Sequence, residues 1–219
     1  MQSRTTTLLT ALIGAVCVWF FVHFASHPRR VRNDVVQGIL IGWGMAFLTA
    51  QILARMTATR INGWITMYGL GDPRNGMFVR AAHALAFPGP VNAAEESMYW
   101  RTSCDGEGRA LNGRHDYTMQ FPPGGLPPNS AFWSLTMGDA MNRFVPNPIN
   151  RWAVSDHSGL VPNGDGSVDI YIQHGAPAGH ESNWLPAPKG HFTLWLRVYL
   201  PGQAILDGTY DVPAVVRAR

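Results

Sequence analysis

Two long apolar segments near the amino terminus constrain the fold more than any other feature of this sequence. Residues 7–26 contain one ionisable side chain, His23, and residues 35–54 contain none. Each segment has about the 20 apolar residues that an α-helix needs to cross the hydrocarbon core of a bilayer. A cleaved signal peptide is the competing interpretation of the first segment, but no A-x-A cleavage pattern follows it. We therefore predict two transmembrane helices, at about 7–26 and 35–54, which make residues 1–56 a membrane hairpin.

The basic side chains are concentrated in the same part of the chain. Residues 1–61 hold six arginines and one aspartate, and the rest of the sequence holds 11 basic and 13 acidic residues. Arg29, Arg30 and Arg32 lie between the two apolar segments, and basic loops of membrane proteins face the cytoplasm. We therefore expect a protein of the bacterial inner membrane, with both termini and the C-terminal domain on the periplasmic side. The nearly neutral remainder has no basic patch that would indicate a nucleic-acid partner.

Gly38 and Gly42 form a small-xxx-small pair in the second apolar segment. Such a pair lets another helix approach closely. The neighbouring helix is either the first helix of the same hairpin or a helix of a partner subunit, and both interpretations remain open at this point.

The chain changes character after the second apolar segment. Residues 57–93 contain many glycines, asparagines and prolines of the kind that form turns, and we interpret them as a connector. Within the connector, residues 77–87 have the spacing of a short amphipathic helix. This helix would lie on the following domain or on the membrane surface.

Residues 94–219 have the pattern of a β domain. Short runs of aromatic and β-branched residues alternate with runs of turn-forming residues. Trp133, Leu135 and Met137 would share one face of a strand, and every second residue from 192 to 200 is apolar. Many strands without intervening helices predict a mainly β fold, an antiparallel, jelly-roll-like β-sandwich.

Histidines gather in one segment of this domain, where His174, His180 and His191 lie close to Glu181. Three histidines, or two histidines and a glutamate, can bind zinc. Here glycines and prolines separate the candidates, and no helical pair of histidines fixes their geometry in advance. We therefore expect no metal site and no other cofactor.

A second polar group, formed by Asn147, Asn150 and Arg151, allows two alternatives. In a structural clasp, the asparagine side chains would bind backbone groups, and Arg151 would pair with an acid such as Glu181. In a ligand cleft, the same residues and a tryptophan such as Trp184 would bind a sugar ring or another planar ligand.

Several blocks of this sequence, in the same order, resemble the bacterial family known as domain of unknown function 1214. The blocks are FPPGGLPPNSAFWSLTMGDA, FVPNPINRWAVSD, DGSVDIYIQH, ESNWLPAP and FTLWLRVYLPGQAILDGTY, and the resemblance covers about residues 94–215. It implies a jelly-roll-like β-sandwich outside the cytoplasm. The companion domain 1254, which often accompanies this family, is not recognised here. The resemblance gives no activity to carry over, but it gives weight to Asn147, Pro148, Asn150, Arg151, His174, Glu181, Ser182, Asn183, Trp184, Leu185 and Pro186.

These observations lead to two hypotheses for the function. The first is a membrane-anchored periplasmic binding or scaffolding module, either an accessory subunit of a membrane complex or a binder of an envelope glycan. The second is a periplasmic hydrolase or isomerase that acts on small polar or carbohydrate-like substrates. In such an enzyme His174 would act as acid or base, Glu181 would orient it, and Asn183 or Asn150 would stabilise an oxyanion.

Overall fold

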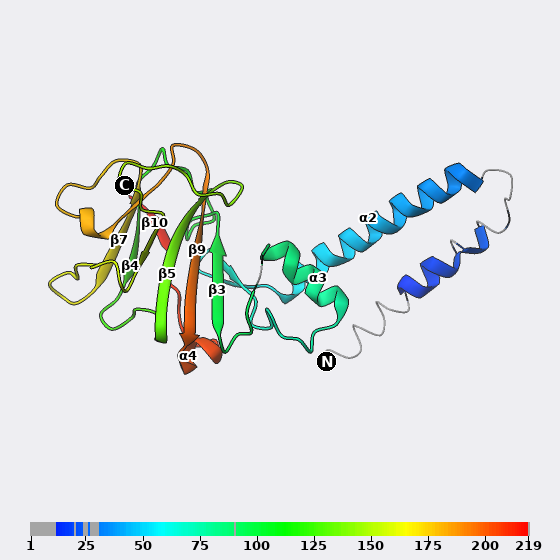
Figure 1. The fold of residues 1–219 in the computed structure, drawn as a ribbon, viewed down its shortest axis with the longest axis horizontal. Helices are drawn as coiled ribbons and strands as arrows, with labels where there is room; N and C mark the ends of the chain where they lie inside the picture. Colours follow the sequence, from blue (N-terminus) through cyan, green and yellow to red (C-terminus); the bar gives the residue numbers. More distant parts are fainter. Residues whose placement is uncertain (1–11, 20, 24–25, 27–30, 90, 219) are drawn as a thin grey trace. The chain divides into compact units, whose positions relative to one another are not determined.

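The computed structural model describes residues 12–19, 21–23, 26, 31–89 and 91–218 (Figure 1). The chain divides into two compact units, Met1–Thr49 and Ala50–Arg219. The first unit is helical in its described part, and the second is mainly β.

Helix α2, Val31–Thr57, contains the second predicted span. Within the part of the chain that the structure describes, the segment Asp34–Thr57 is the one helix that is long and apolar enough to cross a membrane. The first predicted span is helical at 12–19 and 21–23, and its other residues except Ser26 lie outside the described ones. The predicted two-helix hairpin is therefore not confirmed. Arg29 and Arg30 also lie outside the described residues, whereas Arg32 belongs to α2, because this helix begins earlier than predicted.

The described strands of the second unit form two sheets. The larger sheet has six strands in the order β1-β2-β3-β9-β5-β6, and the smaller has four in the order β10-β4-β7-β8. The bounds are β1 Thr59–Ile61, β2 Trp64–Thr66, β3 Ser97–Thr102, β4 Tyr117–Phe121, β5 Asn129–Asp139, β6 Ala153–Ser155, β7 Val168–Gln173, β8 Trp184–Pro186, β9 Phe192–Pro201 and β10 Val215–Arg217. Neighbouring strands are antiparallel except β7 and β8, which are parallel. The mainly β, sandwich-like fold is confirmed, and the parallel pair is the difference from the predicted antiparallel arrangement.

The main core lies between the two sheets. The predicted alternation on β5 is confirmed, because Trp133, Leu135 and Met137 are all buried in this core. The alternate residues of β9 from Phe192 to Val198 join them, and Ile170 on β7 belongs to the core from the smaller sheet. Each large apolar side chain buried in this way contributes about 1.5–3 kcal/mol, so these strands supply much of the stability.

The connector contributes a hairpin to the larger sheet. Strands β1 and β2 are joined by Asn62 and Gly63, whose φ angles of +50° and +86° are those of a tight hairpin turn. Trp64 follows the turn, is fully buried, and donates from Nε1 to the carbonyl of Pro213 at 2.9 Å. The sandwich therefore begins within residues 57–93, before the predicted boundary at residue 94.

A second, smaller core lies on the other face of the larger sheet. Helix α3, Met77–Ala86, contributes Ala82 to this core. Phe87, directly after the end of the helix, packs edge-on against Trp195 of β9. Ala54, in the last turns of α2, belongs to the same cluster. The predicted short helix in the connector is thus present and covers part of this sheet. Two short helices, η2 at Glu181–Asn183 and α4 at Gln203–Leu206, complete the unit.

Candidate functional site

A small pocket opens where two connections of the sandwich meet. It lies between the β5–β6 connection and the segment that follows β8, and its volume is about 150 Å³. The lining residues are Val145, Pro146, Asn147, Pro148, His174, Pro186, Ala187, Pro188 and Lys189. Residues that the sequence singled out in three separate blocks are therefore brought together here. The volume is below the roughly 300–1,000 Å³ of most ligand pockets, so this pocket suits a single side chain or ring.

His174 follows β7 and is held by the backbone on the opposite wall of the pocket. Its Nδ1 lies 2.9 Å from the carbonyl oxygen of Ala187. In the neutral ring Nδ1 donates this hydrogen bond, so the lone pair is on Nε2. The residue is exposed to solvent, and Nε2 can therefore accept a hydrogen bond from a ligand.

The β5–β6 connection is closed on itself by Asn147. Its Oδ1 accepts from the backbone N–H of Arg151 at 2.9 Å, and its Nδ2 donates to the carbonyl of Arg151 at 3.0 Å. Asn150 between them has a left-handed φ of +51°, a conformation that asparagine tolerates better than most residues. Trp152 Nε1 donates to the carbonyl of Val145 at 2.9 Å. These contacts make the connection a braced loop, as expected for a clasp.

Arg151 joins this loop to the segment that precedes β8. Its Nη1 lies 2.9, 3.1 and 2.9 Å from the carbonyl oxygens of Glu181, Ser182 and Trp184. The predicted ion pair between Arg151 and the Glu181 carboxylate is wrong. That carboxylate instead accepts from the backbone N–H of Gly179 at 3.2 Å. The guanidinium instead binds the backbone carbonyls of two η2 residues and of Trp184, which follows η2, and a basic side chain near the C-terminal end of a helix commonly binds carbonyls in this way.

Asn183 fixes the same segment from the inside. Its Oδ1 accepts from the N–H of Val161 at 2.8 Å, and its Nδ2 donates to the carbonyls of Val161 and Asp169, both at 2.8 Å. The neighbouring Trp184 is buried and donates from Nε1 to the carbonyl of Gln173 at 2.9 Å. The polar atoms of both side chains are therefore engaged with the backbone.

The residues proposed for catalysis do not assemble around His174. Glu181 and Asn183 bind backbone groups of their own surroundings, and the exposed Asn150 serves as a turn residue. The ring of His180 packs against Tyr171 in a tilted arrangement, with the ring centroids 4.7 Å apart. His191 Nδ1 lies 3.2 Å from the carbonyl oxygen of Leu111. Among the residues that the structure describes, no three His, Cys, Asp or Glu side chains lie close enough together to hold a metal ion.

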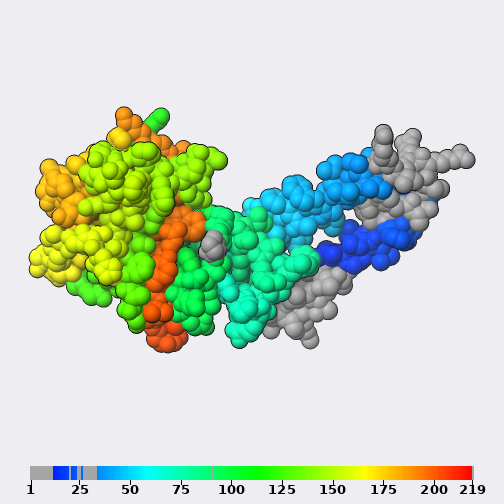
Figure 2. Space-filling view, in the orientation of Figure 1, coloured from blue at the N-terminus to red at the C-terminus, as the bar shows by residue number. Residues whose placement is uncertain are grey.

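The braced loop also exposes apolar side chains, which the sequence interpretation missed. Met141 and Phe144 are each 69% exposed, Ile149 is 45% exposed and Trp152 is 37% exposed. We call these four residues the 141–152 surface. Phe144 and Trp152 are neighbours, with ring centroids 6.1 Å apart. The segment between them lines the pocket, so pocket and surface adjoin, and residues 140–152 appear in yellow-green on the face shown in Figure 2. The sequence signal that could have indicated this surface was the presence of Phe144, Ile149 and Trp152 in a proline-rich loop.

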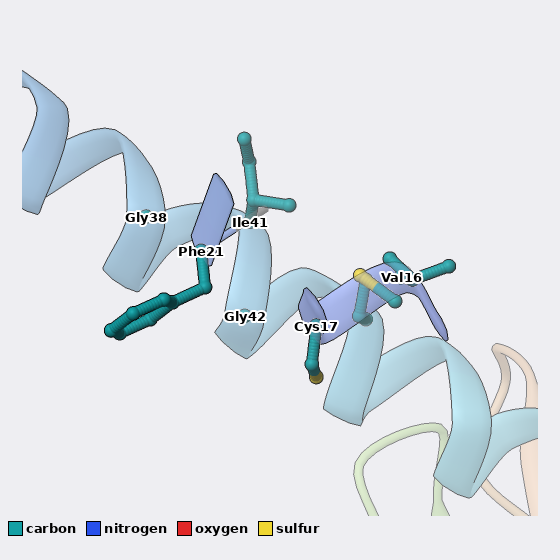
Figure 3. A pocket seen from close by; sticks show the side chains of 7 residues that line it. Val16, Cys17, Phe21, Gly38, Ile41 and Gly42 are labelled. Carbon is teal, nitrogen blue, oxygen red and sulfur yellow. The ribbon is translucent and has the colours of Figure 1, made fainter. Parts of the chain in front are cut away.

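In the first unit, Gly38 and Gly42 border an apolar hollow. It has a volume of about 390 Å³ and is lined by Val16, Cys17, Phe21, Gly38, Ile41, Gly42 and Met45 (Figure 3). Among the described residues, nothing lies within 4 Å of the place where a Cβ on Gly42 would be. At Gly42 the glycine pair therefore makes no tight contact with the described part of a neighbouring helix.

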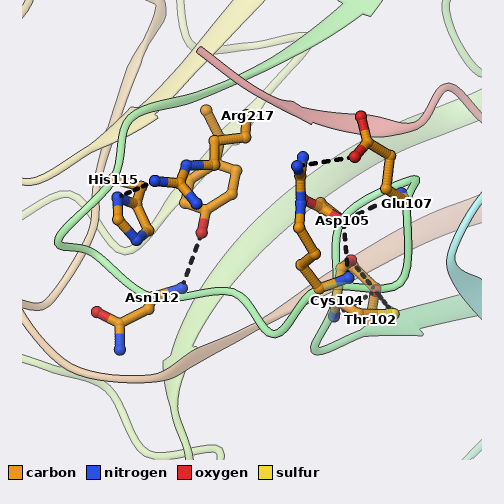
Figure 4. A network of polar contacts seen from close by, with 9 residues as sticks. Thr102, Cys104, Asp105, Glu107, Asn112, His115 and Arg217 are labelled. Carbon is orange, nitrogen blue, oxygen red and sulfur yellow. Dashed lines mark hydrogen bonds and ion pairs between the residues drawn. The ribbon is translucent and has the colours of Figure 1, made fainter. Parts of the chain in front are cut away.

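A polar network near the β1–β2 turn was not singled out by the sequence either (Figure 4). Asp105 is buried and binds Arg109 Nε at 2.8 Å and the N–H groups of Glu107 and Arg109. Burial by itself raises the pKa of Asp105, but these hydrogen bonds and the Arg109 charge outweigh it and hold the pKa below its usual value. Thr102 Oγ1 donates within the network to the carbonyl of Gly63 at 2.8 Å. The network ties the hairpin to the sandwich and is structural.

Two comparisons with known proteins found similar chains. Residues 96–203 match the family described as "Protein of unknown function (DUF1214)". The crystal structure of the VPA0106 protein from Vibrio parahaemolyticus is similar at 27% identity and a TM-score of 0.55, over 65% of this chain and 35% of that one. An uncharacterised protein from Burkholderia cenocepacia matches at 17% identity and a TM-score of 0.41, over 56% of this chain and 30% of that one. This chain thus spans about a third of the length of both.

A search of functionally curated proteins found no match. The family match covers β3 to β9, which includes the braced loop, the pocket and the segment from His174 to Pro186. The prediction made from the sequence blocks is therefore confirmed, and the chain belongs to the DUF1214 family.

Proposed function

We propose that this protein is a membrane-anchored, non-catalytic binding module that holds a segment of another envelope protein on its 141–152 surface. Helix α2 would anchor it in the bacterial inner membrane, and the sandwich would face the periplasm. In this role it acts as an accessory subunit of a membrane complex.

The observation that carries this proposal is an apolar surface on a rigid loop. Asn147 and Arg151 are hydrogen-bonded to each other, and Arg151 also binds the carbonyl of Trp184, so this part of the loop is held in place. Yet Met141 and Phe144 are left largely in water. Fully burying a side chain of this size is worth about 1.5–3 kcal/mol, and contiguous exposed apolar groups mark interaction sites. Aromatic residues and methionine are also enriched where proteins bind one another.

The adjoining pocket supports a peptide segment as the bound group. Four of its nine lining residues are prolines, and His174 and Lys189, which also line it, offer polar contacts. At about 150 Å³ it accepts one side chain of a partner, while the neighbouring apolar residues cover the rest. An enzyme has less support, because the groups proposed to act with His174 are bound elsewhere.

The anchor and its orientation are supported by composition. The apolar segment Asp34–Thr57 is long enough to cross a bilayer. The arginines that precede it favour a cytoplasmic start and hence a periplasmic sandwich.

Site-specific photo-crosslinking in native membranes tests the proposal. Phe144→p-benzoylphenylalanine places a reactive ketone on the 141–152 surface with little change in shape. The matched control is Val216→p-benzoylphenylalanine, because Val216 is 57% exposed, against 69% for Phe144, but lies on β10 of the other sheet. We expect one discrete protein adduct at position 144 and none at 216.

The nature of the adduct separates the alternatives. An adduct at 144 that is removed by a glycan-degrading enzyme but not by protease would show an envelope-glycan binder instead. Identical adducts at 144 and 216, or none at 144, would refute a specific surface.

A further inference from the structure

Helix α3 is apolar on two opposite faces. Its sequence, MFVRAAHALA, has Arg80 as its one permanently charged residue. One face buries Ala82 and His83 against the domain, and burial lowers the pKa of His83, so this ring stays neutral near pH 7. The other face exposes Met77, Phe78 and Leu85 to 69%, 49% and 41%.

The exposed apolar residues of α3 form one continuous stripe. At 3.6 residues per turn, positions 77, 81, 84 and 85 fall on one side of the helix, and position 78 borders them. Ala81 and Ala84 are exposed as well. A helix on a water-facing surface normally carries polar residues there, and a helix that is apolar all round is normally buried. We therefore expect the exposed face of α3 to be covered by another apolar surface.

The position of α3 in the fold indicates which surface covers its exposed face. The last turns of α2, from Ala50, belong to the same unit as α3, and Ala54 shares a buried cluster with Ala82 and Phe87. Because α2 carries the apolar segment that ends at Thr57, α3 is packed at the point where the chain would leave the bilayer.

The charges around this point suit a lipid surface. Arg55, Arg60 and Arg80 are exposed, and residues 50–61 and 77–86 contain no acidic residue. Arginines next to an apolar stripe pair with lipid phosphates, while the stripe enters the boundary between headgroups and acyl chains.

We propose that the exposed face of α3 is seated in the lipid interface, with Arg80 at the level of the phosphates. The inference rests on the proposed membrane anchor α2. The sandwich is then held against the bilayer by a second contact, in addition to the transmembrane helix. Figure 2 shows residues 77–86, in blue-green, at the surface of their unit.

Photo-crosslinking of the purified full-length chain in phosphatidylcholine–phosphatidylglycerol vesicles tests this contact. p-Benzoylphenylalanine is placed at Phe78, and in a second variant at Leu85, and both positions are exposed. Trp43, an exposed residue of α2, is the positive control for the anchor, and Val216 on the opposite sheet is the negative control. We expect lipid adducts at 78 and 85 comparable to those at 43, and none at 216.

The controls separate the two proposals. Lipid adducts at 43 but not at 78 or 85 would overturn the inference about α3 and leave the anchor standing. The absence of lipid adducts at 43 would overturn the anchor itself, and α3 adducts in that case would show binding without a transmembrane helix. A protein adduct of twice the chain mass at 78 would overturn the inference in favour of a second copy as the cover.

Discussion

Replacing Asn183 by alanine is expected to destabilise the sandwich strongly, although the residue lies in a short surface helix. Asn183 is only 5% exposed, and its amide makes three hydrogen bonds of 2.8 Å to the backbone of Val161 and Asp169. Each such bond contributes about 1 kcal/mol net, and the backbone groups of Val161 and Asp169 lose these partners. The expected loss is about 3 kcal/mol. For a domain of this size it corresponds to a fall in Tm of about 6–12 °C.

Thermal unfolding of the full chain in detergent, followed by tryptophan fluorescence, measures this loss. Ser182→Ala is the matched control, because Ser182 is the preceding residue and is exposed. Glu181→Ala is a second control, since its carboxylate makes one exposed contact with the N–H of Gly179. Both controls are expected to change stability by less than about 0.5 kcal/mol. If Asn183→Ala unfolds at the same temperature as Ser182→Ala, the clasp does not contribute to stability and the reasoning is refuted.

Two further predictions concern the polar network and a close backbone contact. Because the pKa of Asp105 is held below its usual value, its contribution to stability is present above the unfolded pKa of about 3.9 and is lost as the pH falls through the lower folded value. Tm should therefore fall with acidification more steeply in the wild type than in Asp105→Asn, and parallel curves would argue against this role. Gly113→Ala would place a Cβ in steric clash with the carbonyl oxygen of Pro188, whereas a Cβ at Gly190 would have no described residue within 4 Å. Circular dichroism should show a large loss of Tm for the first variant and little change for the second, and equal values would contradict the close contact.

Sequence patterns predicted much of the fold, because the strands and helices depend on residues that lie close together in the sequence. The alternation of Trp133, Leu135 and Met137 is set by the geometry of a strand, and the apolar stretch of α2 by the spacing of a helix. The hairpin at Asn62-Gly63 was equally local, and its Asn-Gly signal was missed because the surrounding turn residues suggested an irregular connector.

The candidate site was less predictable because its contacts are distant in sequence. The sequence indicated that Arg151 and Glu181 belong together, but not that the guanidinium binds the carbonyl oxygen while the carboxylate turns away. The partners of Asn183 at Val161 and Asp169 depend on how three separate segments pack. Only side-chain donors and acceptors can be read from residue types, whereas backbone carbonyls are the same at every position.

The two sheets end on very short strands. In the described part of the sandwich the outermost strands are β1, β6, β8 and β10, and each has three residues. Short edge strands protect a β protein from edge-to-edge aggregation, because an incoming chain finds few free backbone groups to pair with. The same property bears on recognition. A ligand protein gains little by adding a strand to either sheet, so affinity and selectivity must come from side chains on the connections between strands.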